Sequence, residues 1–159
     1  WHFFTADGEA YHAVGNFRSD ASYAVESRLY RWWEDQVDVL GGFVPVQAIP
    51  SMGAMDWEGF TIDGQDYLAG AFYTDGSTRN VDSPIYRWDG AAMTQIQAIP
   101  THGAADWEAF TVDGEAYLAV ANNHDDSTFN LDSVIHRWDG AAFVPFQAVP
   151  SSGGYDWEA

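Results

Sequence analysis

The sequence predicts an all-β protein built from β-propeller blades of four antiparallel strands. Three observations support this prediction. The 159-residue chain repeats itself at a period of 50 residues, each repeat holds short apolar runs separated by Asp-Gly turns, and no segment of ten or more residues shows helical periodicity. Four short strands in about 50 residues are typical of one propeller blade.

The repeat divides the whole chain into three units and the start of a fourth. Residues 57–106 and 107–156 align position for position, and residues 1–56 follow the same frame with six extra residues within an insertion at 33–42. A further repeat starts at 157–159. Because closed propellers need at least about four blades, we expect an open arrangement, completed by other chains or by the rest of a longer protein.

The first hairpin of each unit is predicted most clearly in the third unit. Alternating residues 107–112 and the apolar run 115–122 flank the pair Asp113-Gly114. Asp-Gly between two apolar runs favours a two-residue hairpin turn. The polar segment 123–133 is then expected to connect this hairpin to the next one.

The second hairpin is predicted from residues 134–138 and 141–150, which again flank an Asp-Gly pair. Pro145 lies inside the last of these strands, and Pro45 occupies the same position in the first unit. Since proline has no backbone N–H for a strand ladder, we expect the last strand to form the outer edge of its blade.

Most tryptophans follow the repeat. Seven of the eight fall at two repeated positions, where large rings are expected to fill the wedge between neighbouring blades. Rings at repeated positions are also compatible with ligand platforms. Trp33 alone lies outside the register, in the insertion, and we expect it to be an exposed contact residue. The periodic residues are Trp1, Trp32, Trp57, Trp88, Trp107, Trp138 and Trp157.

The composition excludes several classes of protein. With 24 acidic and 6 basic residues, the formal net charge is −18, which repels the phosphates of nucleic acid and the surface of anionic membranes. No apolar run is long enough for a membrane-spanning helix, so membrane insertion is not expected. The absence of cysteine excludes disulfides and thiolate metal sites.

Repeated carboxylates form the first candidate site. If the first strand of each blade is innermost, acidic residues beside the repeated tryptophans ring one mouth of the channel, and a hard cation such as Ca²⁺ would relieve their repulsion. The alternative is that the aspartates cap turns and the glutamates pair with periodic arginines, namely Arg31, Arg87 and Arg137. The candidate ligands are Asp56, Glu58, Asp106, Glu108 and Asp156.

The polar loop between the two hairpins is the second candidate site. Its carboxylates Asp125, Asp126 and Asp132 are compatible with Ca²⁺, although their spacing is not that of an EF-hand, and aspartate is equally expected there as a turn former. We expect the working surface to combine these loops with the insertion. Its candidate binding residues are Trp33 and the aligned loop residues Tyr23, Arg79 and Phe129.

Catalysis is not expected. The five histidines occupy five different repeat positions, and the sequence has no zinc-protease, phosphate-loop or serine-hydrolase motif. Periodic carboxylates indicate copies of one structural role, whereas catalysis usually needs a single asymmetric set of residues.

Three motifs recur in order through the chain. They are the run from Asp106 to Asn122, the segment from Ser133 to Trp138, and the segment from Phe143 to Gly153, which has a counterpart from Met93 to Ala104. With these motifs the units resemble the epilepsy-associated repeat, also called the EAR or EPTP repeat. The resemblance implies a β-propeller from a secreted or cell-surface protein that binds other ectodomains and is not an enzyme.

These observations predict a non-catalytic extracellular module for protein binding, adhesion or assembly, with a protein partner or a second copy as its ligand. Two alternatives stay open. One is a subunit of a homopolymeric extracellular fibre. The other is a lectin whose repeated loops bind glycans with avidity, although Tyr23, Arg79 and Phe129 differ too much for identical sugar pockets.

Overall fold

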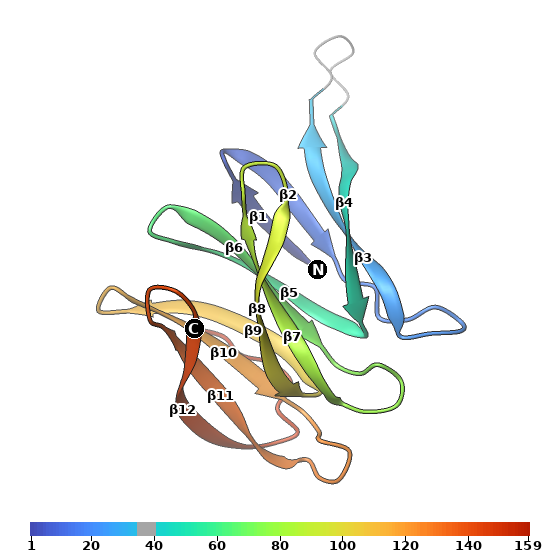
Figure 1. Cartoon of the computed structure of the whole chain (residues 1–159), viewed down its shortest axis with the longest axis vertical. Coiled ribbons are helices and arrows are strands. Elements are labelled where there is room, and N and C mark those ends of the chain that lie inside the picture. Colours follow the sequence, from blue (N-terminus) through green and yellow to red (C-terminus); the bar gives the residue numbers. More distant parts are fainter. Residues whose placement is uncertain (35–40) are drawn as a thin grey trace.

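The computed structural model describes residues 1–34 and 41–159. In these residues twelve strands and no helix form three four-stranded antiparallel sheets (Figure 1). The predicted all-β architecture of four-stranded blades is therefore confirmed, and the three sheets do not close into a ring. None of the described segments is a helix that could cross a membrane.

Each sheet follows chain order, so within a sheet every strand pairs with the strands next to it in sequence. The first sheet contains β1 (His2–Ala6), β2 (Glu9–Val14), β3 (Ala24–Trp33) and β4 (Gly42–Met52). The second contains β5 (Ala54–Ile62), β6 (Gln65–Phe72), β7 (Asn80–Trp88) and β8 (Met93–His102). The third contains β9 (Ala104–Val112), β10 (Glu115–Asn122), β11 (Asn130–Trp138) and β12 (Phe143–Ser152). The first strands lie side by side, because β5 contacts both β1 and β9.

The first hairpin of every sheet closes on the predicted Asp-Gly turn. Both turn residues have positive φ, which matches the right-handed twist of the flanking strands. Local chemistry therefore fixes the register of these hairpins. The turns are Asp7-Gly8, Asp63-Gly64 and Asp113-Gly114.

The last strand of each sheet is its outer edge, as the prolines predicted. Pro45 lies opposite Tyr30 and Pro145 opposite His136, in both cases where the register shifts by one residue. An edge strand with a bulge tolerates the missing N–H of proline because no further strand needs it.

The predicted boundary between polar connector and strand is wrong. Residues 130–133 belong to β11 and pair with the end of β12. Their polar side chains are satisfied within the sheet, since the Ser133 hydroxyl accepts the Asn122 N–H at 3.2 Å and bonds the Ser151 hydroxyl at 3.0 Å. Hydrogen bonding inside the sheet thus extends the strand into a segment that its composition marks as a loop.

Glycines make the turn from each sheet to the next. Gly53 and Gly103 both have a φ of 55°, and their N–H groups donate to the carbonyl oxygens of Tyr23 and Arg79 at 2.9 and 2.6 Å. The sheet boundaries fall at these glycines, so the first strand of the second and third sheets starts three residues before the repeated tryptophan.

Replacing Gly103 with alanine is expected to destabilise the chain. A Cβ there would lie 2.9 Å from the carbonyl oxygen of His124, in a backbone region that costs a non-glycine residue about 1–3 kcal/mol. Gly42→Ala is the matched control, because nothing lies within 4 Å of its Cβ position and its φ is not positive. Urea unfolding measures both variants, and equal midpoints would contradict the strained turn.

The core consists of two apolar clusters, one at each junction between sheets. Trp57 and Trp107 are 0% and 1% exposed and anchor the first and second cluster, and Trp88 is also buried, so the predicted packing role is confirmed for these rings. It is wrong for Trp1, which is 79% exposed, and for Trp32. Trp32 lies on β3 and Trp1 directly precedes β1, on a side of the first sheet that no described sheet covers.

Candidate functional site

Three loops gather along one side of the molecule. They join the second and third strands of each sheet and comprise residues 15–23, 73–79 and 123–129 (Figure 1, lower right). We call them together the loop face. They contain three of the four predicted binding residues.

The second and third loops are built on the same turn. The Asp75 Oδ1 accepts from the N–H and hydroxyl of Ser77 at 2.7 and 2.8 Å and from the Thr78 N–H at 2.9 Å. Asp125 makes the same three bonds to Ser127 and Thr128. These bonds, led by that from the Ser127 hydroxyl, lower the pKa of Asp125 to about 2. The turn-forming interpretation of this residue is therefore the one that the structure supports.

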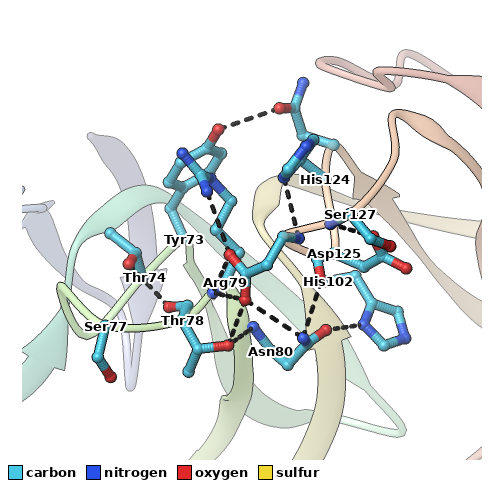
Figure 2. Close-up of polar contacts among 12 residues, drawn as sticks. Tyr73, Thr74, Ser77, Thr78, Arg79, Asn80, His102, His124, Asp125 and Ser127 are labelled. Atoms are coloured by element: carbon cyan, nitrogen blue, oxygen red, sulfur yellow. Dashed lines mark hydrogen bonds and ion pairs between the residues drawn. The ribbon is translucent and has the colours of Figure 1, made fainter.

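Asp126 ties the second loop to the third, and Figure 2 labels its partners Thr78, Arg79 and His124. Its carboxylate accepts from the Thr78 hydroxyl at 2.5 Å, and from the Arg79 N–H and guanidinium at 3.0 and 3.1 Å. Its own N–H donates to Nδ1 of His124 at 3.0 Å, which helps to hold its backbone at a φ of 78°. These bonds lower the pKa of Asp126, the Thr78 hydroxyl contributing most. The two loops thus form one connected surface.

Two predicted binding residues line a single small cavity in the loop face. Tyr23 and Arg79 meet there with Phe17 and Tyr73, around a volume of about 160 Å³. The Arg79 guanidinium lies 5.6 Å from the centre of the Tyr73 ring. Because Arg79 is also paired with Asp126, that carboxylate largely neutralises the charge of its guanidinium.

Phe129 is the most open of the predicted residues on the loop face. Its ring is 55% exposed and lies 4.2 Å from the His124 ring, centre to centre. Its carbonyl oxygen accepts the Gly153 N–H at 2.7 Å. An exposed aromatic side chain is therefore presented on a backbone that is held in place.

Trp33 does not belong to this surface, so the prediction of one surface that joins the loops and the insertion is wrong. Trp33 ends β3, whereas the loop face adjoins the other end of that strand, at Ala24. Ten residues of strand span roughly 30 Å. The reason is that Trp33 extends the β3–β4 hairpin, pairing with Gly42. Residues 35–40 of the insertion lie outside the described residues.

Three further residues hold the loop face together, and sequence reasoning missed Tyr73 among them. The Tyr73 hydroxyl donates to Oδ1 of Asn123 at 3.1 Å, and Nδ2 of Asn80 donates to the Asp125 carbonyl oxygen at 3.0 Å. Tyr73 and Asn123 occupy the same repeat position yet differ in type. Unequal residues at one repeat position were the available signal for an asymmetric contact between neighbouring units.

The repeated carboxylates on β5 and β9 lie close together but bind backbone groups. Oε1 of Glu58 accepts the Ala109 N–H at 3.2 Å, and its Oε2 lies 3.2 Å from Nδ1 of His2. Oδ2 of Asp106 accepts the Trp157 N–H at 2.8 Å. Burial, with Glu108 among the nearby charges, raises the pKa of Glu58 to about 7. These carboxylates thus connect the first strand of one unit to that of the next.

The alternative that these glutamates pair with periodic arginines is wrong in the described part of the chain. The ion pairs there join Glu26 to Arg28 and Asp126 to Arg79, while Glu58 lies against the imidazole of His2. Two of the three periodic arginines contact aromatic rings instead, since Arg31 lies over Trp33 at 5.2 Å and Arg137 over Phe146 at 5.9 Å.

Within residues 1–34 and 41–159, no three histidine, aspartate or glutamate side chains are placed to hold a metal ion. The Asp125 carboxylate accepts hydrogen bonds from its own loop and the Asp126 carboxylate accepts them from the second loop. Asp132 and Asp156 are exposed. Calcium binding remains a prediction for these residues.

Comparison with known proteins identifies the repeat. A family model described as the EPTP domain matches residues 42–89 and 94–139. The human thrombospondin-type laminin G domain and EAR repeat-containing protein is 40% identical over 91 residues, which cover 57% of this chain and 13% of that protein. The mouse protein of the same name is 34% identical over 93 residues, covering 58% of this chain and 13% of that protein. The matched region therefore spans only a small part of these relatives.

Proposed function

Because the chain belongs to the EPTP repeat family, a family of non-enzymatic repeats that serve protein interaction, we propose that it binds a basic surface of another extracellular protein through the loop face. The names of its relatives, which combine EAR repeats with a laminin G domain, support a role outside the cell or at its surface. The same protein contact would serve adhesion or assembly.

The observation that carries this proposal is the exposed ring of Phe129. Most large apolar side chains near the sheet junctions are buried, whereas this ring is 55% exposed on a loop fixed by the Gly153 bond and by the Asp125 turn. Aromatic residues that are rigid before binding contribute strongly to protein interfaces, because little conformational entropy is lost when they are covered.

The charge of the loop face defines the partner's chemistry. The three loops hold four carboxylates and two arginines. Arg79 is paired with Asp126, and Arg18 lies 5.6 Å from the centre of the Tyr23 ring. With a net charge of −18 over the whole chain, the field around this surface attracts basic proteins and repels acidic ones. The exposed carboxylates near this face include Asp20, Asp75 and Asp82.

Biolayer interferometry against a panel of purified ectodomains, half with positive and half with negative net charge, tests the proposal. We expect binding only to positive members, and weaker binding when salt is raised from about 0.05 to about 0.5 M. Phe129→Ser should weaken binding about tenfold or more, as loss of an interface anchor does. Trp33→Ser is the matched control, since Trp33 is 54% exposed at the other end of its strand.

Two results would contradict the proposal. One is a panel in which positive members bind no better than negative ones. The other is a loss of binding in Trp33→Ser that Phe129→Ser does not show, which would move the working surface to the far end of the β3–β4 hairpin.

A further inference from the structure

A cavity of about 570 Å³ lies at the junction between the first and second sheets, and we call it the junction cavity. One side is formed by β7 and β8, where Tyr86 lies opposite Gln95 and Pro84 opposite Ala98. The end of β4, with Met52, lines the other side. Both sides come from consecutive repeats, whereas any further repeat would stack on the outer face of the first or third sheet.

The lining of the junction cavity has the character of a ligand site. Pockets for small ligands typically have volumes of about 300–1,000 Å³ and combine apolar walls with a few polar groups. Met52, Pro84 and Ala98 contribute apolar surface here, while Asp82 and Tyr86 contribute a carboxylate and a hydroxyl. A ligand in this space can therefore meet both kinds of surface.

The Tyr86 hydroxyl is a polar group without a partner. Tyr86 is only 7% exposed, and no hydrogen bond engages its hydroxyl within residues 1–34 and 41–159. Burial raises the pKa of Tyr86 to about 12, so the hydroxyl keeps its proton at neutral pH. Because buried polar groups in folded proteins are normally hydrogen-bonded, this hydroxyl is a donor for a group that enters the cavity.

The Asp82 carboxylate lacks the cation that its counterpart in the first sheet has. Glu26 occupies the repeat position of Asp82 and forms an ion pair with Arg28 at 3.1 Å. Pro84 stands at the position of that arginine. In the part of the chain that the structure describes, Asp82 forms no ion pair, and its side chain is exposed. The second sheet thus presents a carboxylate that can take a cation from outside.

Asp82, Pro84 and Tyr86 lie on the same face of β7, since alternate residues of a strand share one face. About 13 Å separates the Cα atoms of Asp82 and Tyr86. A lysine side chain combines an ammonium group with a four-carbon stem that packs against apolar surface. Its ammonium can therefore reach Asp82 while the stem covers Pro84 and the backbone of the lysine lies near Tyr86.

We propose that the junction cavity binds a peptide segment of a partner protein through one of its lysine side chains. The ammonium pairs with the Asp82 carboxylate, the stem packs on Pro84 and Met52, and a backbone carbonyl oxygen of the peptide accepts a hydrogen bond from the Tyr86 hydroxyl. The net charge of −18 favours the approach of such a basic segment. Strands form this cavity, outside the loop face, so neither proposal depends on the other.

The second junction does not repeat this site. Asn122 stands there at the position of Phe72, and His136 at the position of Tyr86. Nδ2 of Asn122 donates to the Asp132 carbonyl oxygen at 3.0 Å, so its amide is bound within the chain. Asp132, the counterpart of the cavity's aspartate, therefore has neither the tyrosine hydroxyl nor the same apolar wall beside it.

NMR of the methionine methyl groups in the 159-residue chain tests the proposal, with the blocked tripeptide Ala-Lys-Ala as the probe. Met52 lines the cavity and is 43% exposed, whereas Met93 is 3% exposed in the first core cluster. We expect the Met52 signal to shift and to saturate with a dissociation constant of about 1 mM, while the Met93 signal stays in place.

Two substitutions separate the contacts. Asp82→Asn should weaken binding of the lysine peptide about tenfold, because a hydrogen-bonded charge pair is lost. Asp132→Asn is the matched control, since it removes the same charge at the same repeat position and should keep the parental affinity. Tyr86→Phe should weaken binding about fivefold without lowering the melting temperature, because no hydrogen bond within the chain is lost. A lower melting temperature in this variant would show that the hydroxyl serves the fold instead.

The tripeptides Ala-norleucine-Ala and Ala-Glu-Ala are the matched probes, since they lack the positive charge. We expect neither to shift the Met52 signal at about 10 mM. A Met52 signal that the lysine peptide leaves in place at this concentration, an equal shift with norleucine, or equal affinities of Asp82→Asn and Asp132→Asn would overturn the proposal. N-acetylglucosamine is a further probe, and a larger Met52 shift with this sugar than with the lysine peptide would assign the cavity to glycans instead.

Discussion

Replacing Trp107 with alanine is expected to cause a large loss of stability. The indole is 1% exposed, and its Nε1 donates to the Gly70 carbonyl oxygen of the second sheet at 3.1 Å. Truncating a buried tryptophan leaves a cavity and costs about 3–5 kcal/mol. At about 2–4 °C per kcal/mol for a chain of this size, the melting temperature should fall by roughly 10 °C.

Trp33→Ala is the control for this prediction. It removes the same side chain from a position that is 54% exposed, where the ring contacts the Arg31 guanidinium at 5.2 Å. Losing an exposed cation–π contact costs about 0.5–1 kcal/mol. Differential scanning calorimetry compares the two variants, and equal losses would show that Trp107 does not hold the second and third sheets together.

Much of the fold could be predicted because its determinants are local. An Asp-Gly pair between apolar runs fixes the first hairpin within ten residues, and the positive φ angles of Asp63 and Gly64 are those that the pair favours. Pro145 similarly marks an edge strand through a property of one residue. Because the sequence repeats at a period of 50, a turn or strand predicted in one unit is predicted in the other units as well.

The contacts between sheets could not be predicted in this way, because they depend on residues about 50 positions apart. Gln97 lies among alternating polar residues of an edge strand, and nothing in its neighbourhood shows that it binds the backbone of Phe143. Glu58 looked like a ligand or an arginine partner, yet its acceptor role is set by the Ala109 N–H of the adjacent first strand. The sequence wrongly placed Trp33 on the same surface as the loops for a related reason, since its distance from them depends on the length of the β3–β4 hairpin.

The acidic residues first suggested a surface charge, but two of them lie inside a junction and should make stability depend on pH. Burial raises the pKa of Glu58 from 4.5 to about 7, and burial together with nearby Asp56 raises the pKa of Asp106 above 3.8. A carboxyl with a higher pKa in the folded than in the unfolded chain binds its proton more tightly when folded. Between the two pKa values, the free energy of unfolding therefore decreases as pH rises.

Stability is accordingly expected to fall between pH 4.5 and about 7, the window set by Glu58. Below this range the carboxyl is protonated in both states and its contribution is complete, and above it the contribution is lost. Since both groups retain contact with solvent, the loss is discounted to about 1–2 kcal/mol each. His2 acts in the opposite direction, because burial lowers its pKa and its contribution is lost as pH falls below 6.5.

Glu58→Gln separates the titration of Glu58 from that of His2. The glutamine amide cannot titrate in this range, and its oxygen still accepts the Ala109 N–H. Thermal unfolding from pH 4.5 to 8 should show a smaller decline in this variant than in the parent, and a higher melting temperature at pH 7.5. Glu115→Gln removes the same charge from an exposed side chain and should keep the parental decline. If both variants keep the parental decline, the Glu58 carboxylate is solvated in the folded chain and does not set the pH dependence of stability.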